Sequence, residues 1–297
     1  MAARASPSGR LSGHGSRSWT GRGYGAHVTR TLLNSMPTWA LAILVVGGSV
    51  AIAAAGLVIV RRSFPELHRH GINDVAGVVI GVLAAVFGII LGFVTVSLYE
   101  SFTEAQANVQ TEATEVLQLY EDTRAFPRAQ ARAARREIKT YVATVRFHEW
   151  HEMSTGHGDP ERSRQHVVHL YNVLRDYEPK TPSQTAFYAD AISRLNDIVD
   201  ARRTRLYQAA ESMPGAFWTM LVIGSLLLIA SLYLLGASNQ RLHMMLVVAV
   251  AILTSFNLLI VVALDHPFSG DISVTTAPFE HGLFEQLHIT RHDLDLR

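Results

Sequence analysis

The chain has 297 residues, of which 48% are hydrophobic and only 17% are charged, and its mean hydropathy is +0.17, which excludes an ordinary soluble domain. The lack of cysteine excludes disulfides, thiolate catalysis and cysteine-bound metal centres. A formal net charge of +1 argues against a nucleic-acid partner, because binding phosphates requires clustered positive charge.

Residues 1–36 are rich in Ser, Gly and Arg and contain five arginines and no acid. They show no sustained apolar period, so they cannot bury enough surface to offset the entropy lost on ordering. We expect a disordered basic N-terminal tail. The alternative is a start codon assigned too far upstream.

Four apolar runs contain no Asp, Glu, Lys or Arg: residues 38–60, 75–98, 215–238 and 242–264. Each is long enough to cross a lipid bilayer, which needs about 20 apolar residues in a helix. A signal peptide does not explain four such runs. The sequence therefore predicts an all-α integral membrane protein with four transmembrane helices in two hairpins, residues 37–98 and 214–264.

Residues 99–213 separate the hairpins and carry apolar residues at helical spacing. Breaks at residues 126–127, 156–160, 178–182 and 214 divide them into four helices, which predicts a helical extramembrane domain between spans two and three. No turn residue separates span two from the first of these helices, so residues 75–124 are predicted to form one rod. Residues 265–297 follow as a C-terminal tail.

Charges of opposite sign flank the first break. The end of the rod is acidic, and the next helix opens with four arginines, Arg128, Arg132, Arg135 and Arg136. If the chain folds back at Pro127, these stretches would face each other in an antiparallel pair.

Orientation is weakly encoded, because five arginines near the spans favour one direction and four favour the other. The basic tail favours a cytoplasmic N-terminus. We therefore expect the helical domain and both termini in the cytoplasm.

Small residues form a stripe in span two, namely Gly77, Gly81, Gly88 and Gly92. Such stripes usually let helices pack closely in lipid. The alternative is that the opposite face, with Phe87 and Phe93, lines the constriction of an ion pathway. The runs hold no acid or base except His243 at the mouth of span four, which favours a passive pore or no transport over a proton-coupled pump.

Residues 148–152 read HEWHE, which fails the HExxH spacing of a zinc protease, so no metal site is expected. Helical steps from Ile138 instead place Glu149 on the buried seam, and Arg202 falls on the seam of the last extramembrane helix. An arginine on a core seam must be paired, so Arg202 is predicted to bind Glu149 or Glu112. The alternative is an anion site at Arg202, Arg203 and Arg205.

Several short strings follow one another along the chain: NDVAG at 73–77, VQTEA at 109–113, HEW at 148–150, ARRTRL at 201–206, MP at 213–214 before Trp218, LDHPFSGD at 264–271 and APF at 277–279. In their order and spacing they resemble the bacterial bestrophin-like family, from about the first span to Phe279. This resemblance implies a multi-pass protein of the plasma membrane, which is the inner membrane of a bacterium, with a helical insertion between spans two and three.

The more distant bestrophins are pentameric anion channels with cytoplasmic termini and a pore along span two. The chain departs from them after span four, where Asp265 and Asp271 are the only acids near the position of the acidic calcium clasp. Calcium gating is therefore not expected.

No catalytic motif is present, so we expect neither an enzyme nor a cofactor. The sequence favours a bestrophin-like membrane scaffold or sensor whose cytoplasmic helical domain binds a protein partner. The alternative is a homo-oligomeric passive anion or small-ion channel with span two lining the pore.

Overall fold

The computed structural model describes residues 24–63, 73–156, 160–235 and 239–294. The helices in these ranges are α1 (Tyr24–Ser35), α2 (Thr38–Ser63), α3 (Asn73–Asp122), α4 (Arg128–Thr144), α5 (Trp150–Thr155), α6 (Pro160–Arg175), α7 (Pro182–Ala210), α8 (Gly215–Leu232), α9 (Gln240–Leu264) and α10 (Leu283–Gln286). A π-helical turn, Val145–Glu149, joins α4 to α5.

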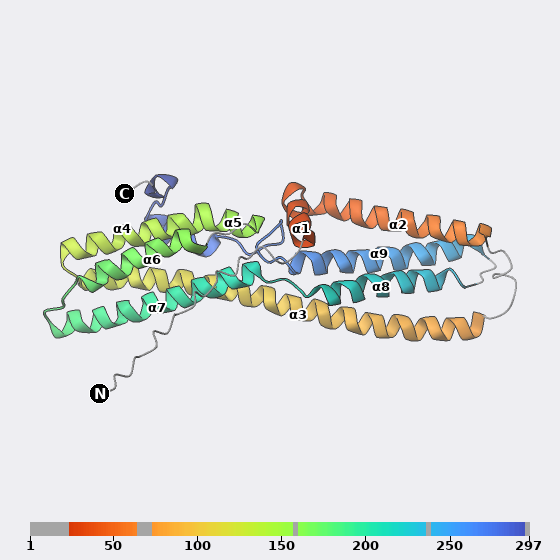
Figure 1. Ribbon diagram of the computed structural model, residues 1–297, viewed down its shortest axis with the longest axis horizontal. Helices are drawn as coiled ribbons and strands as arrows, with labels where there is room; N and C mark the ends of the chain where they lie inside the picture. Colours follow the sequence, from red (N-terminus) through yellow and green to blue (C-terminus); the bar gives the residue numbers. More distant parts are fainter. Residues whose placement is uncertain (1–23, 64–72, 157–159, 236–238, 295–297) are drawn as a thin grey trace, which may run out of the picture.

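The molecule is elongated and has two halves that share one helix (Figure 1). One half contains α2, α8, α9 and the first part of α3, and the other contains α4 to α7 and the last part of α3. Helix α3 has 50 residues, which corresponds to about 75 Å at 1.5 Å per residue. The predictions of an all-helical membrane fold and of a continuous rod are both confirmed.

Four helices are long and apolar enough to span a membrane: α2, α3, α8 and α9. Helix α8 ends at Leu232, so the predicted third span, about residues 215–238, is too long at residues 233–235, and residues 236–238 lie outside the described part of the chain. The helix gives way to turns after Leu232, and the Tyr233 hydroxyl donates to the carbonyl oxygen of Ala53 on α2 at 2.9 Å. Gly56 permits this approach, because a Cβ there would lie 2.7 Å from the Tyr233 hydroxyl oxygen.

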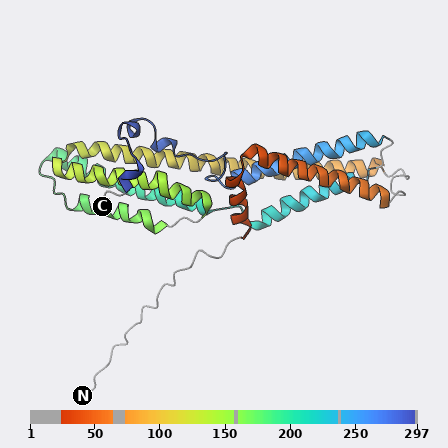
Figure 2. The same ribbon diagram turned by 90° about the horizontal axis from the view of Figure 1, so that it is seen from above.

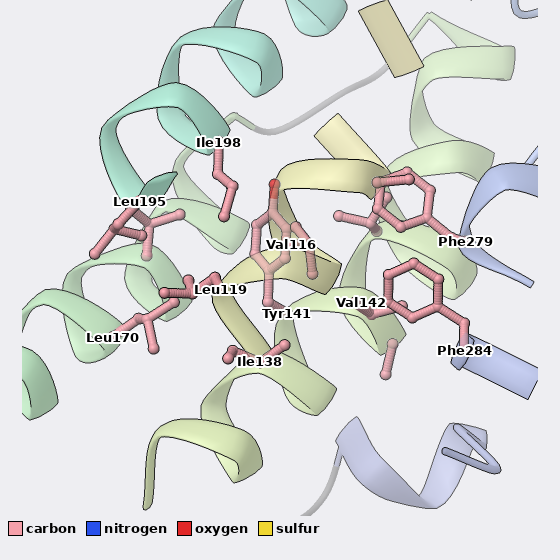
Figure 3. Packing of buried hydrophobic residues seen from close by; sticks show 14 of the residues in the cluster. Val116, Leu119, Ile138, Tyr141, Val142, Leu170, Leu195, Ile198, Phe279 and Phe284 are labelled. Carbon is pink, nitrogen blue, oxygen red and sulfur yellow. The ribbon is translucent and has the colours of Figure 1, made fainter. Parts of the chain in front are cut away.

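The extramembrane half is a bundle whose breaks fall where the sequence predicts them. Thr181 caps α7, since its hydroxyl oxygen accepts from the Gln184 N–H at 3.2 Å, and Pro182 follows at the first helical position. The core of the bundle is apolar and draws on all of its long helices (Figure 3). Its members include Val116 and Leu119 of α3, Ile138 and Val142 of α4, Leu170 of α6, and Leu195 and Ile198 of α7.

The C-terminal segment belongs to this core and is not a separate tail. Phe279 is fully buried and Phe284 is 3% exposed, and their ring centroids lie 5.9 Å apart (Figure 3). Phe268 and Val274 are also buried. The sequence gives no helical period here, because isolated aromatic residues on short turns anchor the segment.

The predicted disorder of residues 1–36 is wrong for residues 24–35, which form α1, while residues 1–23 lie outside the described part of the chain. Both views show α1 crossing the long axis between the two halves (Figures 1 and 2). The Arg30 guanidinium donates to the Ala209 carbonyl at 2.7 Å, and the Asn34 amide donates to the Ser154 carbonyl at 2.8 Å. These contacts with distant helices stabilise α1, although its own residues carry no sustained apolar period.

The predicted charge pairing between α3 and α4 is also wrong. The acidic end of α3 binds α7 instead: Arg194 Nε lies 2.8 Å from Asp122 Oδ2, and its Nη1 lies 3.2 Å from Glu115 Oε2. Helix α7 returns along the full extramembrane length of α3, so it covers the acids first (Figure 1).

Candidate functional site

Four buried charged residues form what we call the arginine–glutamate cluster: Glu112 of α3, Glu149 of the π turn, and Arg202 and Arg205 of α7. Arg205 is at its centre and is fully buried. Its Nε and Nη2 donate to Glu112 at 2.6 and 3.0 Å, and Nη2 also donates to Glu149 Oε2 at 2.7 Å. Arg202 donates to Glu149 Oε1 from Nε at 3.1 Å and from Nη2 at 2.8 Å.

Neutral groups complete the surroundings of this cluster. The Tyr141 hydroxyl donates to Glu112 Oε1 at 2.6 Å. The Arg205 guanidinium lies 5.7 Å from the centre of the Trp150 ring and 3.3 Å from the Met153 sulfur. Two carboxylates thus balance two guanidinium groups, and aromatic and thioether groups cover the rest. This geometry favours the buried ion pair over the open anion site.

The electrostatics agree with that interpretation. Burial raises the pKa of Glu149, but the charges of Arg205 and Arg202 and their hydrogen bonds outweigh it, so the pKa lies below its usual value. Burial lowers the pKa of Arg205, and Glu112 and Glu149 reverse this, so the pKa is raised well above normal. Both ions are therefore held in their charged forms.

The structure brings some of the site residues predicted from the sequence together and leaves others apart. Arg203 is not part of the cluster, because its side chain is 79% exposed and its ion-pair contact is with Asp200 at 3.9 Å. Arg205 receives no special rank from the seam argument, although it lies one turn after Arg202 on the same face. The hydrogen bond from Tyr141 to Glu112 could not be predicted, because the helical spacing of Tyr141 indicates only a buried core position.

The π turn that ends at Glu149 is a second feature that periodicity did not indicate. An extra residue in one turn changes the faces on which the following residues lie, and π turns in helices often occur at functional positions. Here Glu149, at the end of the turn, and Trp150 and Met153, which follow it, all contact Arg205.

The two aromatic candidates of span two lie on different faces of α3. Phe87 is 8% exposed and packs against α8, where a Cβ on Gly224 would lie 2.6 Å from its ring. Phe93 is 74% exposed. Phe87 therefore takes a packing role inside the subunit, and its predicted place on one face with Phe93 is wrong.

The glycine stripe of α3 is open in a single subunit. A Cβ added at Gly77, Gly81, Gly88 or Gly92 would meet no atom within 4 Å among the described residues. The stripe therefore takes no part in helix packing among the residues that the structure describes.

Two of the strings noted in the sequence meet where the halves join. Asp265, at the end of α9, accepts from the Met213 N–H at 2.6 Å and from the Trp218 indole at 3.2 Å. The next residue, His266, is 4% exposed, and burial lowers its pKa while Asp265 opposes the shift. We call Met213, Trp218, Asp265, His266 and the nearby Arg30 the junction cluster.

A cavity of about 600 Å³ lies beside the junction cluster. Phe93 and Phe217 line its transmembrane side, Glu104 and Glu211 line its extramembrane side, and Asp265 also borders it. Within the described residues, no group of three or more His, Asp or Glu side chains has the arrangement of a metal site. The cavity therefore combines an apolar part and an acidic part without a metal cage.

The four spans, the continuous α3 and the helical insertion define a multi-pass helical membrane protein. The family model for the bestrophin-like domain matches residues 47–279, so the chain belongs to the bestrophin-like family. No curated protein matches the chain.

Solved structures of similar fold include those of a bacterial bestrophin homologue from Klebsiella pneumoniae, each with one point mutation. One has a TM-score of 0.62 at 13% sequence identity, and the alignment covers 85% of this chain and 98% of the homologue's chain. Another has a TM-score of 0.60 at 16% identity, with 83% and 96% covered. At these identities the likeness concerns the fold.

Proposed function

We propose that the protein is a homo-oligomeric passive ion channel in which the transmembrane part of α3 lines the pore. Helix α3 carries the proposal. It runs unbroken from the membrane into the extramembrane bundle, and its glycine stripe and Phe93 are uncovered in one subunit. A helix that leaves this much surface open is suited to neighbours of its own kind around an axis.

The chemistry of the spans supports passive conduction over pumping. Their apolar runs contain no Asp, Glu, Lys or Arg, and His243 at the mouth of span four is the one titratable imidazole, so no chain of ionisable groups crosses the spans to relay protons. An apolar ring such as Phe93 can control flow by excluding water from a constriction.

The scaffold or sensor that the sequence favours gains no support from the family or the fold. Known members of the bestrophin family are ion channels, and this supports the channel proposal. A cytoplasmic protein partner and a cytoplasmic location of both termini remain predictions from sequence.

Purified oligomer reconstituted in planar bilayers should carry unitary currents. We expect Phe93→Ala to raise the unitary conductance, because it widens the apolar constriction. Ile52→Ala on α2 is the matched control, since Ile52 is also apolar and is 73% exposed but lies on another helix. It should leave the conductance unchanged.

Silent bilayers containing an oligomer of verified size would reject the channel. Currents that change equally in the Ile52 and Phe93 variants would instead reject α3 as the lining helix.

A further inference from the structure

The cavity beside the junction cluster is formed by a single subunit, and it crosses the level at which the apolar run of α3 ends. Its volume of about 600 Å³ is typical of a small-molecule site. Phe93 and Glu104 of α3 both line it. They are separated by about three helical turns, or about 16 Å, so they project from the same side of the helix. The cavity therefore leads from apolar groups at the level of the membrane to acidic groups outside it.

The apolar part of the cavity has aromatic walls. Phe93 of α3, Tyr207 of α7 and Phe217 of α8 line it, and their exposed fractions are 74%, 60% and 48%. Aromatic rings attract cations as well as apolar groups, because the ring faces carry partial negative charge. Helix α7 ends and α8 begins near the middle of the long axis, so their aromatic residues meet α3 there (Figure 1).

The extramembrane part of the cavity is acidic and has no basic lining residue. Glu104 and Glu211 are exposed there, and neither makes an ion pair with any described residue. The third acid, Asp265, already accepts from the Met213 N–H and the Trp218 indole. No Lys, Arg or His is among the lining residues. The cavity thus favours cations and disfavours anions.

We propose that this cavity binds a small organic cation, with one ammonium group on an apolar chain or ring. The ammonium lies beside the carboxylates of Glu104 and Glu211, and the apolar body lies against Phe93 and Phe217. Burial of apolar surface supplies most of the affinity, because exposed ion pairs contribute little, and the carboxylates select the sign of the charge. This site goes beyond the proposed channel, since one subunit forms it and binding requires no conduction.

The lining residues favour a free organic cation over a phospholipid headgroup. In an ethanolamine or choline headgroup a phosphate lies next to the ammonium, and the cavity offers no Lys, Arg or His side chain to bind it. A metal cation would need several oxygen ligands around one point, and the described acidic side chains form no such group.

Isothermal titration of hexylammonium into the purified full-length protein at pH 7.5, corrected for titration into empty detergent micelles, tests the site. We expect saturable binding. Hexan-1-ol and hexanoate have the same chain length without the positive charge, and hexylphosphocholine adds a phosphate. All three should bind at least about tenfold more weakly than hexylammonium, because they lose or oppose the contact with the carboxylates.

Two variants remove the two parts of the site. Glu104→Gln/Glu211→Gln should weaken hexylammonium binding at least about tenfold, because neutral amides of similar size replace both carboxylates. Phe217→Ala should also weaken it, because it removes part of the aromatic wall. The matched control is Glu178→Gln, which should bind normally, since Glu178 is also exposed but lies between α6 and α7 and does not line the cavity. All these positions are exposed, so the fold should tolerate the changes.

Several results would overturn the organic-cation site: no saturable binding to the wild type, binding of hexanoate or hexan-1-ol as tight as that of hexylammonium, or full binding in the double variant. Equally tight binding of hexylphosphocholine would assign the cavity to a lipid headgroup instead. If the double variant does not fold, Glu211→Gln alone decides the same question, with an expected loss of about threefold. Binding without currents would keep the site and reject the channel, and currents without binding would do the reverse.

Discussion

At the scale of the residue, Arg205 concentrates the electrostatics of the extramembrane bundle. It bridges Glu112 and Glu149, which come from two different elements, while Arg202 contacts Glu149. A buried pair of this kind often adds little net stability, because both ions lose their hydration. Removing one member is costly, because the other stays buried without compensation.

The first prediction compares three arginines of α7. We expect Arg205→Ala to lower the free energy of unfolding by about 3 to 5 kcal/mol, because it leaves the buried Glu112 without an arginine and removes one of the two guanidinium groups bound to Glu149. Arg202→Ala should cost less, since Arg205 still binds Glu149. Arg203→Ala should change it by less than about 0.5 kcal/mol, because Arg203 is exposed.

Thermal unfolding of the full-length protein in detergent, followed by circular dichroism, measures these differences. A loss for Arg202→Ala as large as that for Arg205→Ala would show that Arg205 is not the centre of the cluster.

The second prediction concerns pH and the junction cluster. Burial lowers the pKa of His266 below its ordinary value of 6.5, although Asp265 opposes the shift, and Arg30 lowers it further. Because the folded-state pKa is the lower one, the stabilising contribution is fully present above about pH 6.5 and is lost as the pH falls through the lowered value. The melting temperature should therefore drop on acidification.

His266→Gln should flatten this dependence, because glutamine does not titrate. The variant His169→Gln is the control, since His169 is exposed on α6 and lies outside the junction cluster. If the wild type and His266→Gln lose the same number of degrees between pH 7.5 and pH 5.5, the drop has another origin.

At the scale of the element, α3 has three faces with different roles. One face, with Phe87 and Leu91, packs inside the subunit, the glycine stripe is open, and a third face presents large apolar groups such as Val82 and Phe93. A single helix can therefore serve internal packing and contacts outside the subunit at the same level of the membrane.

The third prediction separates these faces with two equivalent substitutions. Gly224→Ala on α8 would bring a Cβ within 2.6 Å of the Phe87 ring, so it should destabilise the subunit by about 1 to 3 kcal/mol. Phe87→Leu in the same chain should recover part of the loss. Gly88→Ala meets no atom within 4 Å, so it should leave subunit stability unchanged.

A double-mutant cycle of melting temperatures measures the coupling between positions 87 and 224. Additive effects would mean that the two groups do not touch. A Gly88→Ala variant that keeps its subunit stability but dissociates would place the stripe at an interface between copies.

At the scale of the whole molecule, both ends of the described chain hold the two halves together. Helix α1 places Arg30 against the end of α7 and Asn34 against Ser154, and Asn34 also accepts from the Gly270 N–H at 3.0 Å. The segment after α9 then returns to the bundle and buries Phe279. The junction is thus built from segments that lie more than 200 residues apart.

The sequence by itself determined the membrane class, the four spans, the unbroken α3 and the breaks between the extramembrane helices. These features are encoded by local signals, namely long apolar runs, helical periodicity and prolines. They can therefore be recognised without knowing which segments meet in the folded protein. The same period placed Arg202 and Glu149 on buried seams, because a charge on an apolar stripe is visible without knowledge of its partner.

Only the tertiary structure decided the partners. The seam argument could not select Arg205 over Arg202 or bring Tyr141 to Glu112, because those choices depend on how α3, α4 and α7 pack together. The charge pattern on either side of Pro127 paired the α3 acids with α4, whereas Arg194 of α7 binds Glu115 and Asp122. The helix at α1 and the burial of Phe279 likewise depend on contacts between segments far apart in the sequence. The free energy of such contacts cannot be inferred from the composition of either segment alone.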